Sequence, residues 1–579
     1  MHAMKTNRIR WTHVGTMLAL VAAVAAAQQG AKPLPLKYAG PPTKPEITAS
    51  DLMTRLYIFA DDSMMGRNVG TEGNQKGTAY IEREVRKLGL KPAGDSGGYF
   101  QYLPTSLHAL DTSSTLVVDN VVFHAGVDFL ASSPGQPHML HDVQVVFGGT
   151  IADTIDIPPN AEWRGKLVLI KPFFPGPGFN LQQFAQSDGL RRYQAAVRGA
   201  MIVTIGGEGL NPATVRNILS PQGVNLGPTL AGSEAAVSFN VTTRVADAML
   251  GTPVATAAKG THGKPASADI KFTDKWVPVR NVVAILPGSD PKLRGEYVAI
   301  GGHNDHIGFN TRPVDHDSIR AFNEVVRPEG EDSPRRAPTD AEMTRVRAIL
   351  DSLRTTHQPR VDSIYNGADD DGSGSVSVLE IAEAFAKGNV KPKRSILFVW
   401  HVGEERGMWG SRFITDNPPV PRDSIVAQLN MDMVGRGGLN DITGHDISMT
   451  PIHGGPGYLQ LIGSRRLSTE LGDLVEQVNT QQKLGFKFDY ALDANGHDQQ
   501  IYCRSDHYMY ARYGIPIVFF TTGGHADYHQ VTDEPQYIDY DRMASVDKLV
   551  FDIAEKVANL DHRVVVDKPK PDPMGNCQQ

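Results

Sequence analysis

Five short motifs in the C-terminal half of the chain combine histidine and carboxylate side chains in patterns that suit metal-dependent hydrolysis. They are GHNDH at 302–306, NGADDDGSG at 366–374, HVGEERG at 401–407, NMDMVG at 430–435 and DYHQVTD at 527–533. Imidazole nitrogen and carboxylate oxygen are ligands that suit Zn²⁺. The only two cysteines, Cys503 and Cys577, do not have the number or spacing of a thiolate site. Any metal here would therefore be held by imidazole and carboxylate.

The adjacent acids Glu404 and Glu405 lie in the motif at 401–407, which follows the apolar segment 395–400. An unpaired carboxylate at the end of a buried strand is costly, so this pair needs a function at that place. A division of labour meets the need: one glutamate binds a metal, and the other takes a proton from water.

The other motifs are weaker signals when each is taken alone. His303 precedes Asp305 by two residues, a spacing that lets a histidine bind metal while the carboxylate orients its ring. Asp432 lies between two methionines, which ordinarily fill cores. The acids at 369–371 suit a solvated turn or, with flanking glycines, a carboxylate that points inward, but they lack the spacing of a calcium loop. His529 by itself is an ordinary loop histidine.

The elements around these motifs predict an α/β fold. Apolar segments at 297–301, 395–400, 425–429 and 515–520 indicate buried strands, and 373–386 indicates an amphipathic helix between two of them. We expect a doubly wound mixed sheet with helices on both faces. Ligands bind at the carboxyl ends of strands in such sheets, which is where the motifs lie.

Changes in composition divide the rest of the chain. We expect a signal peptide at 1–27, a linker at 28–45, the first part of a peptidase domain at 46–115, a β-rich insertion at 116–276, the catalytic domain at 277–563 and a loose tail at 564–579. Residues 47–90 are expected to be helical. The catalytic domain is itself interrupted by a charged insertion at 311–362.

The first residues have the features of an export signal. Three basic residues precede an apolar run of about 14 residues that ends in Ala25-Ala26-Ala27. The run is shorter than the roughly 20 residues of a spanning helix, so we expect cleavage near Ala27, export, and no stable membrane insertion afterwards. The formal charge of −7 argues against a nucleic-acid partner. The sequence leaves the oligomeric state open.

In their order, the five motifs resemble those of the co-catalytic zinc aminopeptidases of metallopeptidase family twenty-eight. The segments 59–67 and 90–95 are similar to the N-terminal part of such enzymes, and the β-rich insertion, with GKLVLI at 165–170, resembles a protease-associated domain. The resemblance implies two zinc ions per chain. It makes His303 and Asp432 ligands of one zinc, Glu405 and His529 ligands of the other, and Asp370 the bridge.

The same resemblance implies roles for four further positions. Glu404 is the general base, Tyr528 a hydrogen-bond donor to the oxyanion, and Asp305 the partner of His303 behind the metal. The run Ser505-Asp506-His507 supports the pocket and is not a serine-protease triad. The charged insertion is longer than the resemblance leads us to expect, which leaves substrate specificity open.

These features predict a secreted zinc exopeptidase that acts on peptides, with aminopeptidase activity favoured. A carboxypeptidase of the same fold would need a basic group for the substrate carboxylate, for which Arg436, Arg504 and Arg512 are available. A glutaminyl cyclase would bind a single zinc, and a receptor-like binding protein would have lost ligands or the base. The sequence retains all five expected ligands and the expected base, Glu404.

Overall fold

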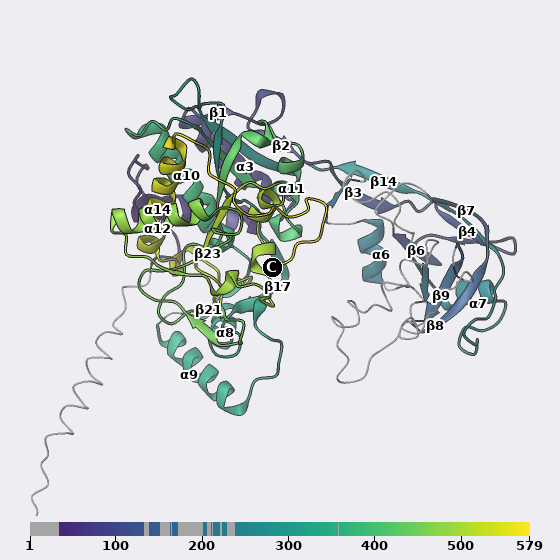
Figure 1. Ribbon diagram of the computed structural model, residues 1–579. Helices are drawn as coiled ribbons and strands as arrows, with labels where there is room; N and C mark the ends of the chain where they lie inside the picture. Colours follow the sequence, from purple (N-terminus) through teal and green to yellow (C-terminus); the bar gives the residue numbers. More distant parts are fainter. Residues whose placement is uncertain are drawn as a thin grey trace, which may run out of the picture.

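The computed structural model describes residues 34–579 apart from 133–137, 151–162, 164, 172–200, 205–209, 211, 221–222, 228–237 and 357. The signal peptide expected at 1–27 lies outside this part. An α/β body and a β-rich lobe are joined by the paired strands β3 (Thr105–Leu110) and β14 (Phe272–Trp276) (Figure 1). Within the described residues, no helix is both long and apolar enough to cross a membrane.

The body is built on a mixed sheet to which nine strands of the described chain belong. In spatial order these are β1 (Lys91–Pro92), β15 (Arg280–Leu286), β19 (Ser395–His401), β16 (Tyr297–His303), β20 (Ile425–Met431), β25 (Ile517–Thr521), β23 (Tyr458–Ile462) and β24 (Lys487–Asp489), with β2 (Phe100–Tyr102) on β15. The four central strands β19, β16, β20 and β25 are parallel. Their carboxyl ends therefore share one edge of the sheet.

Helices cover both faces of this sheet because successive residues of its buried strands point to opposite sides. In β15, Val282 and Ala284 belong to one apolar cluster and Val283 to another. The first cluster contains the apolar faces of α2 (Ala49–Phe59), α3 (Glu72–Lys87), α10 (Gly374–Lys387), α12 (Thr469–Gln482) and α14 (Tyr540–Asn559). The second contains residues of α11 (Trp409–Asp416) and α13 (His507–Ala511). The expected α/β fold is confirmed.

The expected helical stretch at 47–90 is wrong in its middle. Helix α2 ends at Phe59, and a 3₁₀ turn, η1 (Asp62–Arg67), separates it from α3. Inside η1, Gly66 has a φ of 65° and lies against the backbone of Gly308, where a Cβ atom would come within 2.0 Å of the carbonyl oxygen. A continuous helix cannot make this contact.

The β-rich lobe has its own apolar core. One sheet has the order β6 (Phe129–Ser132), β12 (Ser238–Val241), β10 (Met201–Thr204), β9 (Leu167–Lys171) and β8 (Val145–Thr150), and the other has the order β5 (Val121–His124), β4 (Thr115–Val118), β13 (Ala266–Ile270) and β7 (His138–Val143). The described part of the lobe also contains the helices α6 (Pro212–Leu219) and α7 (Thr243–Leu250), and β11 (Asn225–Leu226) pairs with β3. Its resemblance to a protease-associated domain stays a prediction.

The charged stretch at 311–362 is a small subdomain beside the carboxyl edge of the main sheet (Figure 1). It consists of β17 (Phe309–Asp315), α8 (His316–Val326), η4 (Gly330–Asp332), α9 (Asp340–Thr356) and β18 (Val361–Ile364). Strands β17 and β18 pair, and α8 packs on α9 through Ala321, Val326 and Val346.

The C-terminal tail is attached to the body, so the expectation of a loose tail is wrong. Cys577 forms a disulfide with Cys503. The side chain of the last residue, Gln579, accepts a hydrogen bond from the amide of Tyr502 at 2.7 Å and donates to the carbonyl of Leu492. A pairing between residues this far apart in sequence leaves no local pattern by which it could be recognised.

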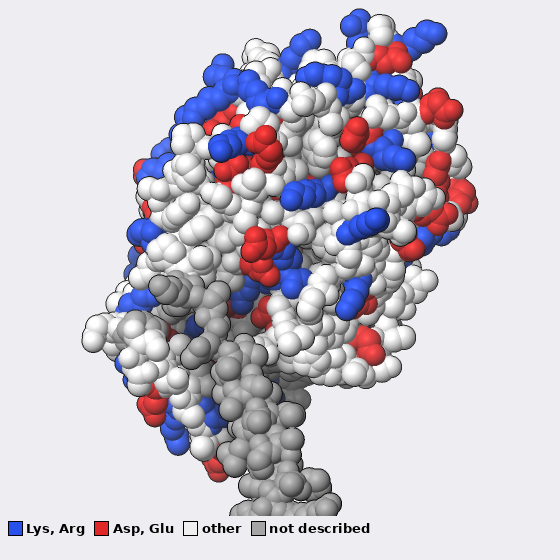
Figure 2. All heavy atoms as spheres, turned by 90° about the vertical axis from the view of Figure 1, so that its left-hand side faces the viewer, with Lys and Arg blue, Asp and Glu red and all other residues white. Residues whose placement is uncertain are grey.

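On the face drawn in Figure 2, basic and acidic side chains are interspersed.

Candidate metal centre

The sheet delivers the motif residues to one place from separate strand ends. His303 is the last residue of β16, and Glu404 and Glu405 follow β19 within four residues. Asp432 directly follows β20, and His529 lies in the loop after β25. Because β16 pairs in register with β19, His303 lies opposite His401.

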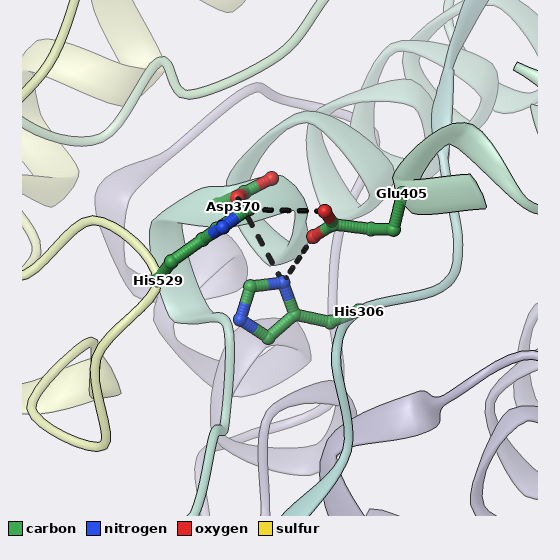
Figure 3. Close-up of side chains that lie close together, drawn as sticks. All are labelled: His306, Asp370, Glu405 and His529. Atoms are coloured by element: carbon green, nitrogen blue, oxygen red, sulfur yellow. Dashed lines mark hydrogen bonds and ion pairs between the residues drawn. The ribbon is translucent and has the colours of Figure 1, made fainter. Parts of the chain in front are cut away.

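Two histidines, His303 and His529, face carboxylates at the edge where the parallel strands end. His303 Nε2 lies 3.1 Å from Oδ1 of Asp370 and 3.7 Å from Oδ1 of Asp432. His529 Nε2 lies 2.9 Å from Oδ2 of Asp370 and 3.1 Å from Oε2 of Glu405. The two oxygens of Asp370 thus face different histidines, as a bridging carboxylate would. Figure 3 shows the His529 side of this arrangement.

The residues present fit a pair of zinc ions. Their donor atoms are imidazole nitrogens and carboxylate oxygens, which are zinc ligands. His303 Nε2 is fully buried and has no hydrogen-bond partner among the described residues, although such atoms are normally paired. A metal ion at this position would give that nitrogen a partner and offset the repulsion between the carboxylates.

The neighbours of Asp370 have other partners. Asp371 accepts hydrogen bonds from the amides of His303 and Gly374, both at 2.8 Å. Asp369 accepts from the amide of Gly435 at 2.7 Å. The geometry therefore favours Asp370 among the three acids as the bridging group.

His306 is a member of the cluster that sequence reasoning missed. Its Nδ1 lies 2.7 Å from Oε1 of Glu405 and 3.8 Å from Oδ2 of Asp370, and its ring lies edge-on to that of His529 (Figure 3). It is fully buried. Its position three residues after His303 is the one signal in the sequence, but the motif at 302–306 by itself predicts a single ligand.

The two adjacent glutamates have opposite surroundings. Burial raises the pKa of Glu404 well above its usual range, and the nearby acids Asp432 and Glu405 add to the effect. Burial and Asp370 act in the same direction on Glu405, but hydrogen bonds from His306 and His529 outweigh them and lower its pKa. Carboxylates whose pKa values are pushed apart serve different roles. The contrast fits a base at Glu404 and a ligand at Glu405.

Asp305 is placed behind His303 mainly through its backbone. The ring Nδ1 of His303 lies 3.1 Å from the carbonyl oxygen of Asp305 and 3.8 Å from its carboxylate. The carboxylate instead accepts hydrogen bonds from the amides of Gly403 at 2.7 Å and Glu404 at 3.3 Å. Asp305 therefore ties the loop that contains the glutamates to the strand end that contains His303.

Ser505 and Tyr528 lie next to the histidines and carboxylates and line the same cavity. The hydroxyl of Ser505 donates to Oδ2 of Asp432 at 2.7 Å. The ring of Tyr528 stacks on His529 with centroids 4.1 Å apart, and its hydroxyl oxygen lies 3.2 Å from Nη2 of Arg504. Arginine can only donate, so Tyr528 accepts this bond and keeps its own proton.

The cluster opens into a cavity with two kinds of wall. Its acidic lining residues are Glu329, Asp332, Asp370, Glu404 and Asp432. Its apolar ones are Met433, Leu492, Ile501 and Phe519. Arg504 lines the cavity but forms an ion pair with Asp332.

The profile of peptidase family M28 matches residues 281–554. This segment belongs to peptidase family M28. The M28 segment contains every residue of the cluster, from His303 to His529.

The M28 segment has relatives among characterised proteins. Leucine aminopeptidase 1 of Aspergillus fumigatus is 30% identical over 204 residues, which are 33% of this chain and 47% of the relative. Leupeptin-inactivating enzyme 1 of Streptomyces exfoliatus is 38% identical over 78 residues, covering 13% of this chain and 18% of the relative. The chain thus spans about half the length of the first relative.

Solved structures with a similar arrangement include a zinc aminopeptidase from Bacillus subtilis, with a TM-score of 0.45 and 15% identity over 91% of this chain and 99% of that one. An aminopeptidase from Aneurinibacillus sp. strain AM-1 has a TM-score of 0.44 and 17% identity over 91% of this chain and 97% of that one.

Arg67 anchors the M28 segment to the N-terminal helices. Its buried guanidinium donates to the carbonyls of Phe59 at 3.1 Å, Asn366 at 2.6 Å and Gly367 at 2.8 Å. The last two begin the turn that contains Asp370. We expect Arg67→Ala to lower the free energy of unfolding by about 3 kcal/mol, because buried carbonyls lose their donors. Urea denaturation measures this.

Arg83→Ala is the matched control, because that side chain is 54% exposed and its contacts, an ion pair with Glu84 and a cation–π contact with Tyr80, lie on the same helix. It is expected to change stability by less than about 0.5 kcal/mol. Equal stability of the Arg67 and Arg83 variants would contradict the anchoring role.

Proposed function

We propose that the chain is a two-zinc aminopeptidase that removes N-terminal residues from peptides. The observation that carries the proposal is Asp370, whose two oxygens face His303 on one side and His529 on the other at 3.1 and 2.9 Å. His303 and Asp432 would hold one zinc, and Glu405 and His529 the other. The names of the relatives of the M28 segment support a peptidase that acts at the N-terminus.

When bound, two zinc ions would polarise the scissile carbonyl and make water a stronger nucleophile. The chain's own residues would supply the proton transfers and the orientation. Glu404 lies in the cavity wall beside Asp432 and would take the proton of the attacking water, then pass it to the leaving amine. The hydroxyl of Tyr528 would donate a hydrogen bond to the oxygen on which negative charge develops.

The charges of the cavity favour aminopeptidase over carboxypeptidase activity. Of the three arginines available to bind a substrate carboxylate, Arg436 donates to Asp527 and Arg512 to Asp416. Arg504 alone among them lines the cavity, and Asp332 neutralises it. The remaining acidic lining suits a free α-ammonium group. The apolar wall suits an uncharged side chain on the first residue.

A panel of matched peptides tests this proposal. We expect a free tripeptide with N-terminal leucine and its C-amidated form to be hydrolysed at similar rates. The N-acetylated form should resist, and a chelator should abolish activity. Equal cleavage of the acetylated peptide would refute the aminopeptidase assignment, and loss of cleavage on amidation would indicate a carboxypeptidase.

We also propose that the protein acts after export. The basic and apolar segments before residue 28 support a cleaved signal. The disulfide between Cys503 and Cys577 suits an oxidising compartment. Determining the N-terminal residue of the protein recovered from the producing cell would check cleavage near Ala27.

A further inference from the structure

The turn at 330–332 of the charged insertion packs against the loop that contains Tyr528 and His529. The amide of Glu331 donates to the carbonyl of Tyr528 at 3.2 Å. Gly330 has a φ of 57°, and a Cβ atom there would lie 2.5 Å from the carbonyl oxygen of Tyr528 and 2.8 Å from its Cβ. Only glycine permits this approach without displacing the backbone.

The side chain of Glu331 contacts His529, one of the histidines of the candidate metal centre. Oε2 of Glu331 lies 2.7 Å from Nδ1 of His529, whose Nε2 faces Asp370 and Glu405. A carboxylate at Nδ1 holds the ring proton on that nitrogen and leaves the lone pair of Nε2 directed at the cluster.

The second side chain contacts the cavity wall. Asp332 accepts hydrogen bonds from Nη1 of Arg504 at 2.8 Å and from Nη2 at 3.2 Å. Nη2 of Arg504 also lies 3.2 Å from the hydroxyl oxygen of Tyr528. Asp332 therefore fixes the guanidinium that orients the Tyr528 hydroxyl.

We propose that the insertion is a working part of the active site, in which Glu331 and Asp332 are positioning residues. Glu331 sets the tautomer and direction of His529, and Asp332 holds Arg504 against Tyr528. This inference rests on the proposed function, since it assigns the two acids to the same zinc site and cavity.

The two residues have separable expected effects. Removing the group that hydrogen-bonds to the second ring nitrogen of a metal-bound histidine typically lowers metal affinity or activity about 10–100-fold. Glu331→Ala should weaken binding of one zinc by about this factor, and Glu331→Gln, which keeps an acceptor for Nδ1–H, should recover part of the loss. Asp332→Ala should lower kcat about 10-fold while leaving zinc affinity unchanged, because its contacts reach Tyr528 and no cluster residue.

Gly330→Ala tests the fit of the segment itself. Because its Cβ would collide with Tyr528, this variant should displace Glu331 and reproduce the zinc loss of Glu331→Ala. Glu324→Ala, at an exposed position of α8 in the same insertion, is the control and should match the unaltered protein.

The experiment measures zinc affinity by competition with a chromogenic chelator and records the absorption spectrum of the cobalt-substituted protein, alongside thermal unfolding and hydrolysis. We expect Glu331→Ala to bind one ion more weakly and to alter the cobalt spectrum, with Glu331→Gln intermediate and folded. Unchanged zinc affinity and spectrum in both Glu331 variants would overturn the inference. An unaltered protein that neither binds zinc nor cleaves peptides would instead refute the proposed function.

Discussion

Replacing Glu404 by glutamine is expected to lower kcat by about 10²–10⁴-fold, the typical contribution of a general base. Glutamine has the size of glutamate but cannot accept the proton of the attacking water. Glu404 lines the cavity, whereas Glu405 lies between His306 and His529. Bound zinc and the melting temperature should therefore stay close to those of the unaltered protein.

Steady-state kinetics with an unblocked leucine peptide, together with metal analysis of the same preparation, check this prediction. Glu324→Gln, an equally isosteric change at an exposed site, supplies the control. Near-normal turnover of the Glu404→Gln variant would show that another group is the base. A large loss of zinc would show that Glu404 is a ligand.

Replacing Asp370 by asparagine is expected to have an even broader effect. Both oxygens of Asp370 face histidine nitrogens within 3.1 Å, so the change removes a negative charge shared by both halves of the cluster. We expect loss of at least one zinc ion and a fall in kcat/KM of more than about 10³-fold, since metal ions supply several kcal/mol of transition-state stabilisation.

Asp432→Asn provides the comparison, because Asp432 faces only His303 among the cluster histidines. It should lose the ion on that side and keep the ion held by Glu405 and His529. Zinc counts and residual rates of the two variants can be measured side by side. If Asp370→Asn retained two ions and normal activity, Asp370 could not be the bridge.

Much of the candidate site could be predicted because its signals are local. The apolar segments that precede His303, Glu404 and Asp432 belong to strands β16, β19 and β20, and each motif begins in the last one or two residues of its strand. Strand ends of a parallel sheet meet at one edge, so short motifs far apart in sequence are brought together by the fold class alone.

The contacts that could not be predicted depend on the path of the chain between elements. His306 shares the motif of His303, and only the turn after β16 directs its ring to Glu405. Arg67 reaches Asn366 across 299 positions of sequence, and Glu331 reaches His529 across 198. Neither Arg67 nor Glu331 belongs to a periodic pattern. In the sequence, each is indistinguishable from an ordinary charged residue at the surface.

The most direct test of the central claim is a zinc count on purified, active protein, followed by stepwise return of zinc to the metal-free protein while leucine-peptide hydrolysis is recorded. The account predicts two zinc ions per chain and full activity only when both are restored. Full peptide hydrolysis with one zinc per chain, or with none, would contradict it.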